Sequence, residues 1–249
     1  MTTDWRPALA PHELRADRGS PLVVARLGTV PYGDAWDLQR RLVAQRQDGG
    51  GRDTLLLLEH PRVYTLGKRA DRSNVLLDDA ELARRGIEVV AVDRGGDVTY
   101  HGPGQLVGYP ILRLAGTRAV VDYVRSLEEI LVRTLAGFGV TGERSPGYTG
   151  VSVADEKVAA IGVRVTSGGV TSHGFALNVT TDLADFAGIV PCGISDRGVC
   201  SLASLGVATT VDAVATAVEQ AAAEVLGATL EVADPDLVAV APTPTKAPL

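Results

Sequence analysis

The stretch from Lys157 to Val179, KVAAIGVRV-TSGG-VTSHGFALNV, determines the fold more than any other part of the chain. Two apolar runs, 157–165 and 170–179, flank the short segment Thr166-Ser167-Gly168-Gly169. Apolar runs with β-branched residues on either side of a short Gly-containing segment predict a β-hairpin. We therefore expect an antiparallel strand pair here.

The rest of the chain adds further strands and a few helices. Hydrophobic spacing predicts helices at 32–47, 78–85, 120–135 and 211–225, and strands at 22–27, 54–58, 63–66, 87–92 and 105–112. The strands come in clusters and do not alternate regularly with helices. The predicted fold class is therefore α+β, a mixed, mostly antiparallel sheet with helices packed on one side of it.

Length and composition indicate one main domain. The chain has 249 residues, of which 45% are hydrophobic, and no linker-like break interrupts its middle, so a single domain is expected over 21–232. Residues 1–20 lack periodicity, and 233–249 form a Pro/Ala-rich tail. Both ends are predicted to be disordered.

Charge and cysteine content exclude several classes of protein. A net charge of -6 argues against a general nucleic-acid binder. No apolar run has the roughly 20 residues of a membrane span, and no leader peptide is recognisable, so we expect a soluble cytoplasmic protein. Two cysteines are too few for a disulfide framework. The histidines show no paired metal-ligand spacing, so neither a metal nor a cofactor is expected.

A Gly-rich segment from Arg94 to Gln105, RGGDVTYHGPGQ, carries most of the polar diversity of the chain. It lacks the Gly-Lys-Ser/Thr ending of a P-loop, and its glycines miss the dinucleotide-binding spacing. A phosphate loop, a tight corner between strands and a binding wall all remain open from these residues. We favour the wall, because glycines let a backbone approach a ligand closely.

Cys192 is the candidate nucleophile. Cysteine is commonly a small buried hydrophobe, but Pro191 and Gly193 bracket this one in a turn-like setting with little apolar cover. Cys200, in the strand-like run 198–202, is interpreted as a packing residue.

A nucleophilic thiol needs a neighbouring cation or base to become a thiolate. Lys157 opens an otherwise apolar strand, so it is either a solvated strand end or a lysine shielded from water that exchanges protons. His101 and His173 compete for the same role, and composition does not choose among the three.

Five segments in the same order resemble the octanoyltransferases of lipoate assembly, also called lipoyl(octanoyl) transferases. The similarity runs from about Leu22 to Val232 and is carried by 59–67 (EHPRVYTLG), 94–105, 157–163 (KVAAIGV), 173–179 (HGFALNV) and 190–194 (VPCGI). One departure is visible, since the family leads us to expect Thr where Cys200 stands. Both tails lie outside the match.

This resemblance implies a fold related to the biotin and lipoate protein ligases, and it implies site residues. Cys192 and Lys157 fall on the family's catalytic pair. Its substrate-contacting segments fall on Arg94, Gly95, Gly96, Asp97, Val98, Thr99, Tyr100, His101, Ala160, Ile161, Gly162, Gly174, Phe175 and Ala176.

The implied reaction moves an octanoyl group from acyl carrier protein to a lysine of a lipoyl domain, with 2-oxo acid dehydrogenases and the glycine cleavage H protein as the acceptors. The hypothesis is that the Cys192 thiolate takes the acyl group as a thioester, helped by Lys157. The enzyme is expected to act as a monomer. Both protein partners are expected to be acidic, and Arg62, Lys68, Arg69 and Arg72 form a candidate docking patch.

Two alternatives remain. An ATP-dependent lipoate or biotin ligase on the same fold would use Mg²⁺ and hold phosphate on the Arg94 loop, and Cys192 would be dispensable. A non-catalytic protein that binds an effector or an acyl carrier would keep its function without Cys192 or Lys157.

Overall fold

The predicted hairpin is the centre of the fold in a computed structural model that describes residues 13–116, 119–145, 147–190 and 198–239. Strand β8 (Glu156–Val165) pairs antiparallel with β9 (Thr171–Asn178). The connecting turn is closed by hydrogen bonds from Thr166 N–H to Val170 O (2.9 Å) and from Gly169 N–H to Thr166 O (2.9 Å). The hairpin prediction is confirmed.

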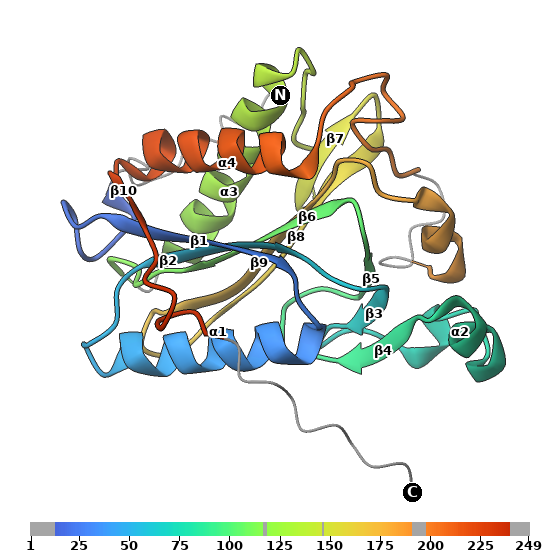
Figure 1. The fold of residues 1–249 in the computed structure, drawn as a ribbon, viewed down its shortest axis with the longest axis horizontal. Coiled ribbons are helices and arrows are strands. Elements are labelled where there is room, and N and C mark those ends of the chain that lie inside the picture. Colours follow the sequence, from blue (N-terminus) through green and yellow to red (C-terminus); the bar gives the residue numbers. More distant parts are fainter. Residues whose placement is uncertain (1–12, 117–118, 146, 191–197, 240–249) are drawn as a thin grey trace, which may run out of the picture.

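Seven strands form the main sheet in the order β10-β1-β2-β6-β9-β8-β7 (Figure 1). Strand β1 runs parallel to β2 and β10, and the remaining neighbours are antiparallel. The sheet is therefore mixed and mostly antiparallel, as predicted. Its other strands are β1 (Leu22–Thr29), β2 (Thr54–Glu59), β6 (Gln105–Ile111), β7 (Gly150–Val153) and β10 (Leu230–Val232).

Helices cover both faces of this sheet, so the expected one-sided packing was wrong. Helices α3 (Ala119–Gly137) and α4 (Val211–Leu226) lie on one face and α1 (Tyr32–Gln47) on the other (Figure 1). The physical reason lies in strand β2. Leu55 and Leu57 belong to the core under α3 and α4, whereas Leu56 and Leu58 belong to the core under α1. A continuous apolar strand of this kind needs cover on both sides.

Local signals set the helix ends. Thr210 caps α4 through its side-chain oxygen, and Gly227 ends the helix in the left-handed conformation at φ 58°. Helix α2 (Asp79–Arg85) is enclosed in the same way by Asp78 and Gly86. A side-chain oxygen at the start and a glycine after the end satisfy backbone groups that a helix leaves unpaired. No helix in the described ranges has the length and apolar character needed to cross a bilayer.

A second, three-stranded sheet lies beside the main one and was not foreseen as a separate unit. Its order is β4-β3-β5, with β3 (Val63–Leu66) at the centre, β4 (Glu88–Ala91) parallel to it and β5 (Val98–His101) antiparallel. This small sheet shares a core with helix α2 and with the short 3₁₀ helix η3 (Leu183–Gly188). A second 3₁₀ helix, η2 (Arg72–Asn74), lies between β3 and α2 in the chain. Because β5 lies inside the Gly-rich segment, that segment is partly strand.

Some residues in both of the ends expected to be disordered are ordered in the structure. In the N-terminal stretch, Leu14 and Arg15 are buried, so disorder is wrong for 13–20. At the other end, Leu237 and Val238 pack beside α1, and Arg41 Nη2 donates to Ala239 O (2.8 Å). Apolar contacts and this hydrogen bond fix 233–239. Residues 1–12 and 240–249 lie outside the described residues.

A buried charge cluster ties the N-terminal stretch to the main sheet. Asp53 Oδ2 accepts from Arg15 Nε (2.7 Å), and Asp53 Oδ1 accepts from Arg46 Nε (2.9 Å) and from the Arg113 N–H (2.9 Å). All three ionised side chains are almost fully buried. A buried charge that loses its partner is strongly destabilising, so the cluster depends on Asp53.

We expect Asp53→Asn to lower the free energy of unfolding by about 3 kcal/mol, because two buried arginines lose their common counter-charge. Urea denaturation followed by circular dichroism measures this. The matched control is Glu231→Gln, which breaks an exposed pair with Arg52 and should cost less than about 1 kcal/mol. Equal losses in the two variants would contradict the assignment.

Candidate active site

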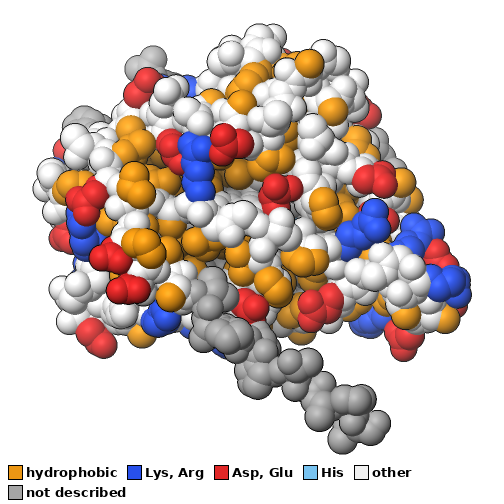
Figure 2. Space-filling view, viewed as in Figure 1, with side chains coloured by type: hydrophobic (Ala, Val, Ile, Leu, Met, Phe, Trp, Pro, Cys, Tyr) orange, Lys and Arg blue, Asp and Glu red, His pale blue; other side chains and the backbone are white. Residues whose placement is uncertain are grey.

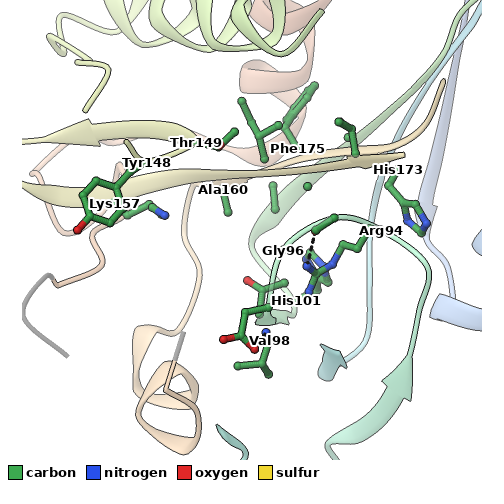
Figure 3. A pocket seen from close by; sticks show the side chains of 18 of the residues that line it. Arg94, Gly96, Val98, His101, Tyr148, Thr149, Lys157, Ala160, His173 and Phe175 are labelled. Carbon is green, nitrogen blue, oxygen red and sulfur yellow. Dashed lines mark hydrogen bonds between the residues drawn. The ribbon is translucent and has the colours of Figure 1, made fainter. Parts of the chain in front are cut away.

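A cavity of about 450 Å³ lies between the β8–β9 hairpin and the Gly-rich segment. Figure 3 shows Lys157 and Tyr148 at one end of it and Arg94 and His173 at the other. Ala160, Gly162, Gly174 and Ala176 come from the hairpin, and Gly95, Gly96, Asp97 and Thr99 come from the opposite wall. The wall interpretation of the Gly-rich segment is therefore consistent with its position.

The Gly-rich wall is docked on a strand edge that β7 leaves open. Strand β7 pairs with β8 only as far as Gly150 and Ala160. Beyond that point the Gly95 N–H donates to Val163 O at 3.0 Å. A Cβ added at Gly162 would lie 3.1 Å from both Arg94 Cδ and Gly95 O. The small residue in β8 therefore sets how closely the wall approaches.

Two charged side chains of the wall, those of Arg94 and Asp97, fix it through hydrogen bonds. The buried Arg94 guanidinium donates to Thr65 O (2.8 Å) and Thr65 Oγ1 (2.9 Å) on β3. The Asp97 carboxylate accepts from Asn74 Nδ2 (3.1 and 3.2 Å) and from the Val98 N–H (2.7 Å). Asp97, whose role the sequence left open, therefore orients its neighbours. Charge-assisted bonds of this kind make the wall rigid.

Among the predicted site residues that the structure describes, all but Tyr100 line the cavity. Tyr100 does not: its ring is buried in the core of the small sheet, and its hydroxyl donates to Asp185 Oδ2 at 3.0 Å. Alternation along β5 points the Tyr100 side chain to the face opposite that of Thr99 and His101, which line the cavity. Cys192 lies outside the described residues.

Lys157 lies in β8, which lines the cavity, and its backbone is fixed by two hydrogen bonds. The Lys157 N–H donates to Gly198 O (3.0 Å), and Lys157 O accepts from the Cys200 N–H (3.1 Å). Residues 198–200 therefore run parallel to the start of β8, with one bridge between Val199 and Lys157. The strand expected at 198–202 is reduced to this bridge.

Buried amides connect the Gly-rich segment to the same backbone. Gln105 Nε2 donates to Asn178 Oδ1 (2.9 Å), and Asn178 Nδ2 donates to Cys200 O (2.9 Å). Gln105 Oε1 lies 2.7 Å from His101 Nδ1, which must carry the proton because an amide oxygen only accepts. Asn178, also left open by the sequence, thus positions the segment beside Lys157.

Two neighbouring histidines are neutral because they are buried. Burial lowers the pKa of His60 to about 4. The same cause, reinforced by the proximity of His60, lowers the pKa of His101 to about 3. His60 donates from Nδ1 to Val30 O (2.7 Å) and accepts at Nε2 from the Tyr109 hydroxyl (2.7 Å).

His173 differs from the other two because it has an acidic partner. Its Nε2 lies 2.8 Å from Asp93 Oδ1, and its backbone has a φ of 56°, which is uncommon for a residue other than glycine. Burial lowers its pKa and outweighs the opposing effect of Asp93. Among the described residues, its Nδ1 has no hydrogen-bond partner.

Sequence reasoning missed several cavity residues outside the matched segments. Tyr32 opens α1, Val124 comes from α3 and Tyr148 from the loop before β7. Tyr32 stacks on His101 with ring centroids 6.0 Å apart. Only a signal for long-range proximity could have found these residues, and no local motif carries one.

Cys200 is a packing residue, as predicted. It is buried in the core under α3 and α4, and burial raises the pKa of its thiol to about 11. A thiol that stays protonated is a poor nucleophile at neutral pH. In the part of the chain that the structure describes, no group of three or more His, Cys, Asp and Glu side chains could hold a metal ion.

Solved structures that share this architecture include lipoate protein ligases. A putative lipoate protein ligase from T. acidophilum with bound lipoic acid aligns with a TM-score of 0.69 at 18% identity, over 86% of this chain and 89% of that one. A bi-partite lipoate protein ligase from Thermoplasma acidophilum, studied with its E2 lipoyl domain, aligns with a TM-score of 0.70 at 17% identity, over 88% and 91%. At these identities the likeness establishes the fold, which is the predicted ligase-like one.

Sequence comparison gives the family. The model of the lipoyl protein ligase A/B catalytic domain matches residues 31–223. Octanoyltransferase from Chloroflexus aggregans is 56% identical over 185 residues, covering 73% of this chain and 84% of that protein. The enzyme of the same name from Nocardia farcinica is 47% identical over 232 residues, covering 90% of each. The chain belongs to the lipoyl protein ligase A/B family and, within it, to the octanoyltransferases. It is an acyltransferase.

The neutral histidines predict a pH dependence of stability. A histidine whose folded pKa is lowered binds a proton more weakly folded than unfolded, so stability is complete above the unfolded pKa of about 6.5 and is lost as pH falls below it. Each of His60 and His101 should contribute a loss of about 2 kcal/mol between pH 7.5 and pH 5.

Urea titrations at the two pH values, on wild type and His60→Gln, measure this contribution. The loss in His60→Gln should be smaller than in wild type by about 2 kcal/mol, because glutamine has no proton to gain. Identical losses in the two proteins would show that the lowered folded pKa of His60 does not contribute to the pH dependence of stability.

Proposed function

We propose that the chain takes an octanoyl group from acyl carrier protein, holds it as a thioester on Cys192, and passes it to the target lysine of a lipoyl domain. The observation that carries this proposal is the position of Lys157. Its side chain lines the acyl-sized cavity, and its backbone binds Gly198 and Cys200. Only residues 193–197 separate Cys192 from Gly198, and the proposal places the thiol beside Lys157.

In the first step, Lys157 Nζ accepts the proton of the Cys192 thiol, or its charge stabilises the thiolate. Sγ attacks the carrier-bound thioester, the bond from the carbonyl carbon to the carrier sulfur breaks, and the carrier thiolate recovers a proton. One thioester replaces another, so this step is nearly balanced in free energy.

In the second step, the target amine attacks the Cys192 thioester, the bond to Sγ breaks, and an amide forms. That amine must be neutral to attack, although a free lysine is mostly protonated at pH 7. Lys157 is the base that we assign to remove its proton. The low pKa of His101, about 3, supports this choice, because so weak a base holds few protons near neutral pH.

The cavity wall fits an unbranched apolar chain. Ala160, Gly162, Gly174 and Ala176 leave room along the hairpin, and Ile161 and Phe175 add apolar surface. Burial at about 0.8 kcal/mol per CH₂ makes six methylenes worth roughly 5 kcal/mol. Backbone N–H groups near Cys192 or along the Gly-rich wall would hold the oxyanion.

The acceptors in this proposal are the lipoyl domains of 2-oxo acid dehydrogenases and the glycine cleavage H protein. The study of a ligase of the same fold with its E2 lipoyl domain supports an acceptor of this kind. We further propose that the enzyme acts as a monomer in the cytoplasm, where Cys192 stays a thiol.

Intact-mass measurement after incubation with octanoyl carrier protein and without ATP tests the covalent route. We expect one octanoyl group on wild type and on Cys200→Ser, and none on Cys192→Ser, because the Cys200 thiol is buried and protonated at neutral pH. The Cys200 variant is therefore the matched control.

Lys157→Ala should slow both acylation and transfer by 10²-fold or more, which is the typical contribution of a positioned proton-transfer group. Product formation with neither cysteine labelled would exclude the thioester. A requirement for ATP would instead favour the ligase alternative.

A further inference from the structure

A basic turn is fixed directly on the substrate-contacting wall. Residues 67–70 form a β-turn closed by the Ala70 N–H and Gly67 O at 2.9 Å, which places Lys68 and Arg69 at its two central positions. Three consecutive N–H groups of this turn, from Gly67, Lys68 and Arg69, donate to Asp97 O (3.3 Å), Arg94 O (3.1 Å) and Gly96 O (3.2 Å).

The turn and the wall are packed so closely at Gly67 that no larger side chain fits between them. A Cβ added at Gly67 would lie 2.5 Å from Gly96 O and 2.8 Å from Arg94 Nη1. Any shift of the turn would therefore move the wall. Lys68 and Arg69 thus keep a fixed relation to the cavity.

Most other basic side chains of this lobe are neutralised by acids. Figure 2 shows Lys and Arg side chains gathered with acidic ones over the lobe that holds α2 and β4. Arg62 lies 3.0 Å from Asp185 Oδ2, Arg72 lies 3.4 Å from Asp79 Oδ1, and Arg84 and Arg85 both pair with Glu81. Of the four residues in the candidate docking patch, Arg62 and Arg72 are thus paired with acids, which leaves Lys68 and Arg69.

Lys68 and Arg69 have no ion-pair or side-chain hydrogen-bond partner within the ranges that the structure describes, and both are exposed. Arg69 also lines the cavity. Asp97 is the acid of the adjoining wall, and its oxygens are bound to Asn74 and Val98. In a chain with a net charge of -6, an unpaired cation that lines the cavity and a second one beside it in the same turn indicate an anionic group on the substrate.

We propose that Lys68 and Arg69 form a subsite for the phosphodiester of the donor's 4′-phosphopantetheine arm. This proposal rests on the thioester donor of the proposed function. The arm carries the acyl thioester at one end and the phosphate at the other, so a thioester inside the cavity leaves the phosphate at its rim. Arg presents a planar set of donors that suits phosphate oxygens, and Lys adds a second point charge.

The test uses small donors that differ only in the phosphate. Wild type is assayed with octanoyl-phosphopantetheine and with octanoyl-pantetheine, with an isolated lipoyl domain as the acceptor. We expect kcat/KM to be about 10-fold higher with the phosphorylated donor, in line with the strength of a charge-assisted hydrogen bond. The ratio should fall as salt increases.

The double variant Lys68→Gln/Arg69→Gln should bring this ratio close to one, and the ratio cancels any general loss of activity. The matched control is Arg84→Gln, an exposed arginine of the same lobe that is paired with Glu81, and it should keep the wild-type ratio. A ratio near one in wild type, or an unchanged ratio in the double variant, would overturn the subsite.

Failure of the subsite and failure of the proposed function give different results. If wild type uses octanoyl-pantetheine and shows no preference for the phosphate, the thioester donor stands and only the subsite is wrong. If wild type transfers octanoyl from none of the thioesters, carrier protein included, both are wrong. If the double variant loses activity with carrier protein alone, the two cations contact the protein surface of the carrier and not the phosphate.

Discussion

The docking of the Gly-rich segment on the open edge of β8 is the contact on which the site depends. Strand β7 begins at Gly150, opposite Ala160, so it leaves the rest of the β8 edge unpaired. The Gly95 N–H therefore binds Val163 O, and the wall lies against a strand of small residues. The cavity exists because two sheets meet there without side chains filling the gap. A bulkier residue at Gly162 would press against Arg94 and Gly95 of the wall, and one at Gly67 would press against Gly96 from the basic turn. The wall therefore has β8 on one side and the basic turn, bound through the N–H groups of residues 67–69, on the other.

Electrostatics then divides the cavity into two ends. Near Arg94, the buried histidines His60 and His101 are neutral, and each is hydrogen-bonded. That end of the cavity therefore offers shape and polarity, but neither histidine is an acid or base suited to neutral pH. At the other end, the backbone of Lys157 is tied to the chain that leads away from Cys192. Under the proposed mechanism, proton transfer is therefore assigned to the Lys157 end of the cavity.

The sequence was informative wherever a feature was local. The hairpin turn, the caps of α2 and α4 and the long helices follow from spacing and from Gly, Thr and Asp at defined positions. Strand β7 was missed because its turn to β8 uses Ala154 and Asp155 at φ 46° and 70°, not the usual Asn-Gly. The wall residues were found through motifs. Tyr32, Val124 and Tyr148 were not, because only the folded chain brings them to the cavity.

The placement of Cys200 explains why this thiol is not a candidate nucleophile. Its backbone is part of the site, since Cys200 O accepts from Asn178 and the Cys200 N–H donates to Lys157 O. Its side chain points into the core instead, where Sγ lies 3.6 Å from Glu156 O and burial raises its pKa to about 11. A small side chain of moderate polarity satisfies that position, which accounts for a cysteine where the family pattern suggests threonine.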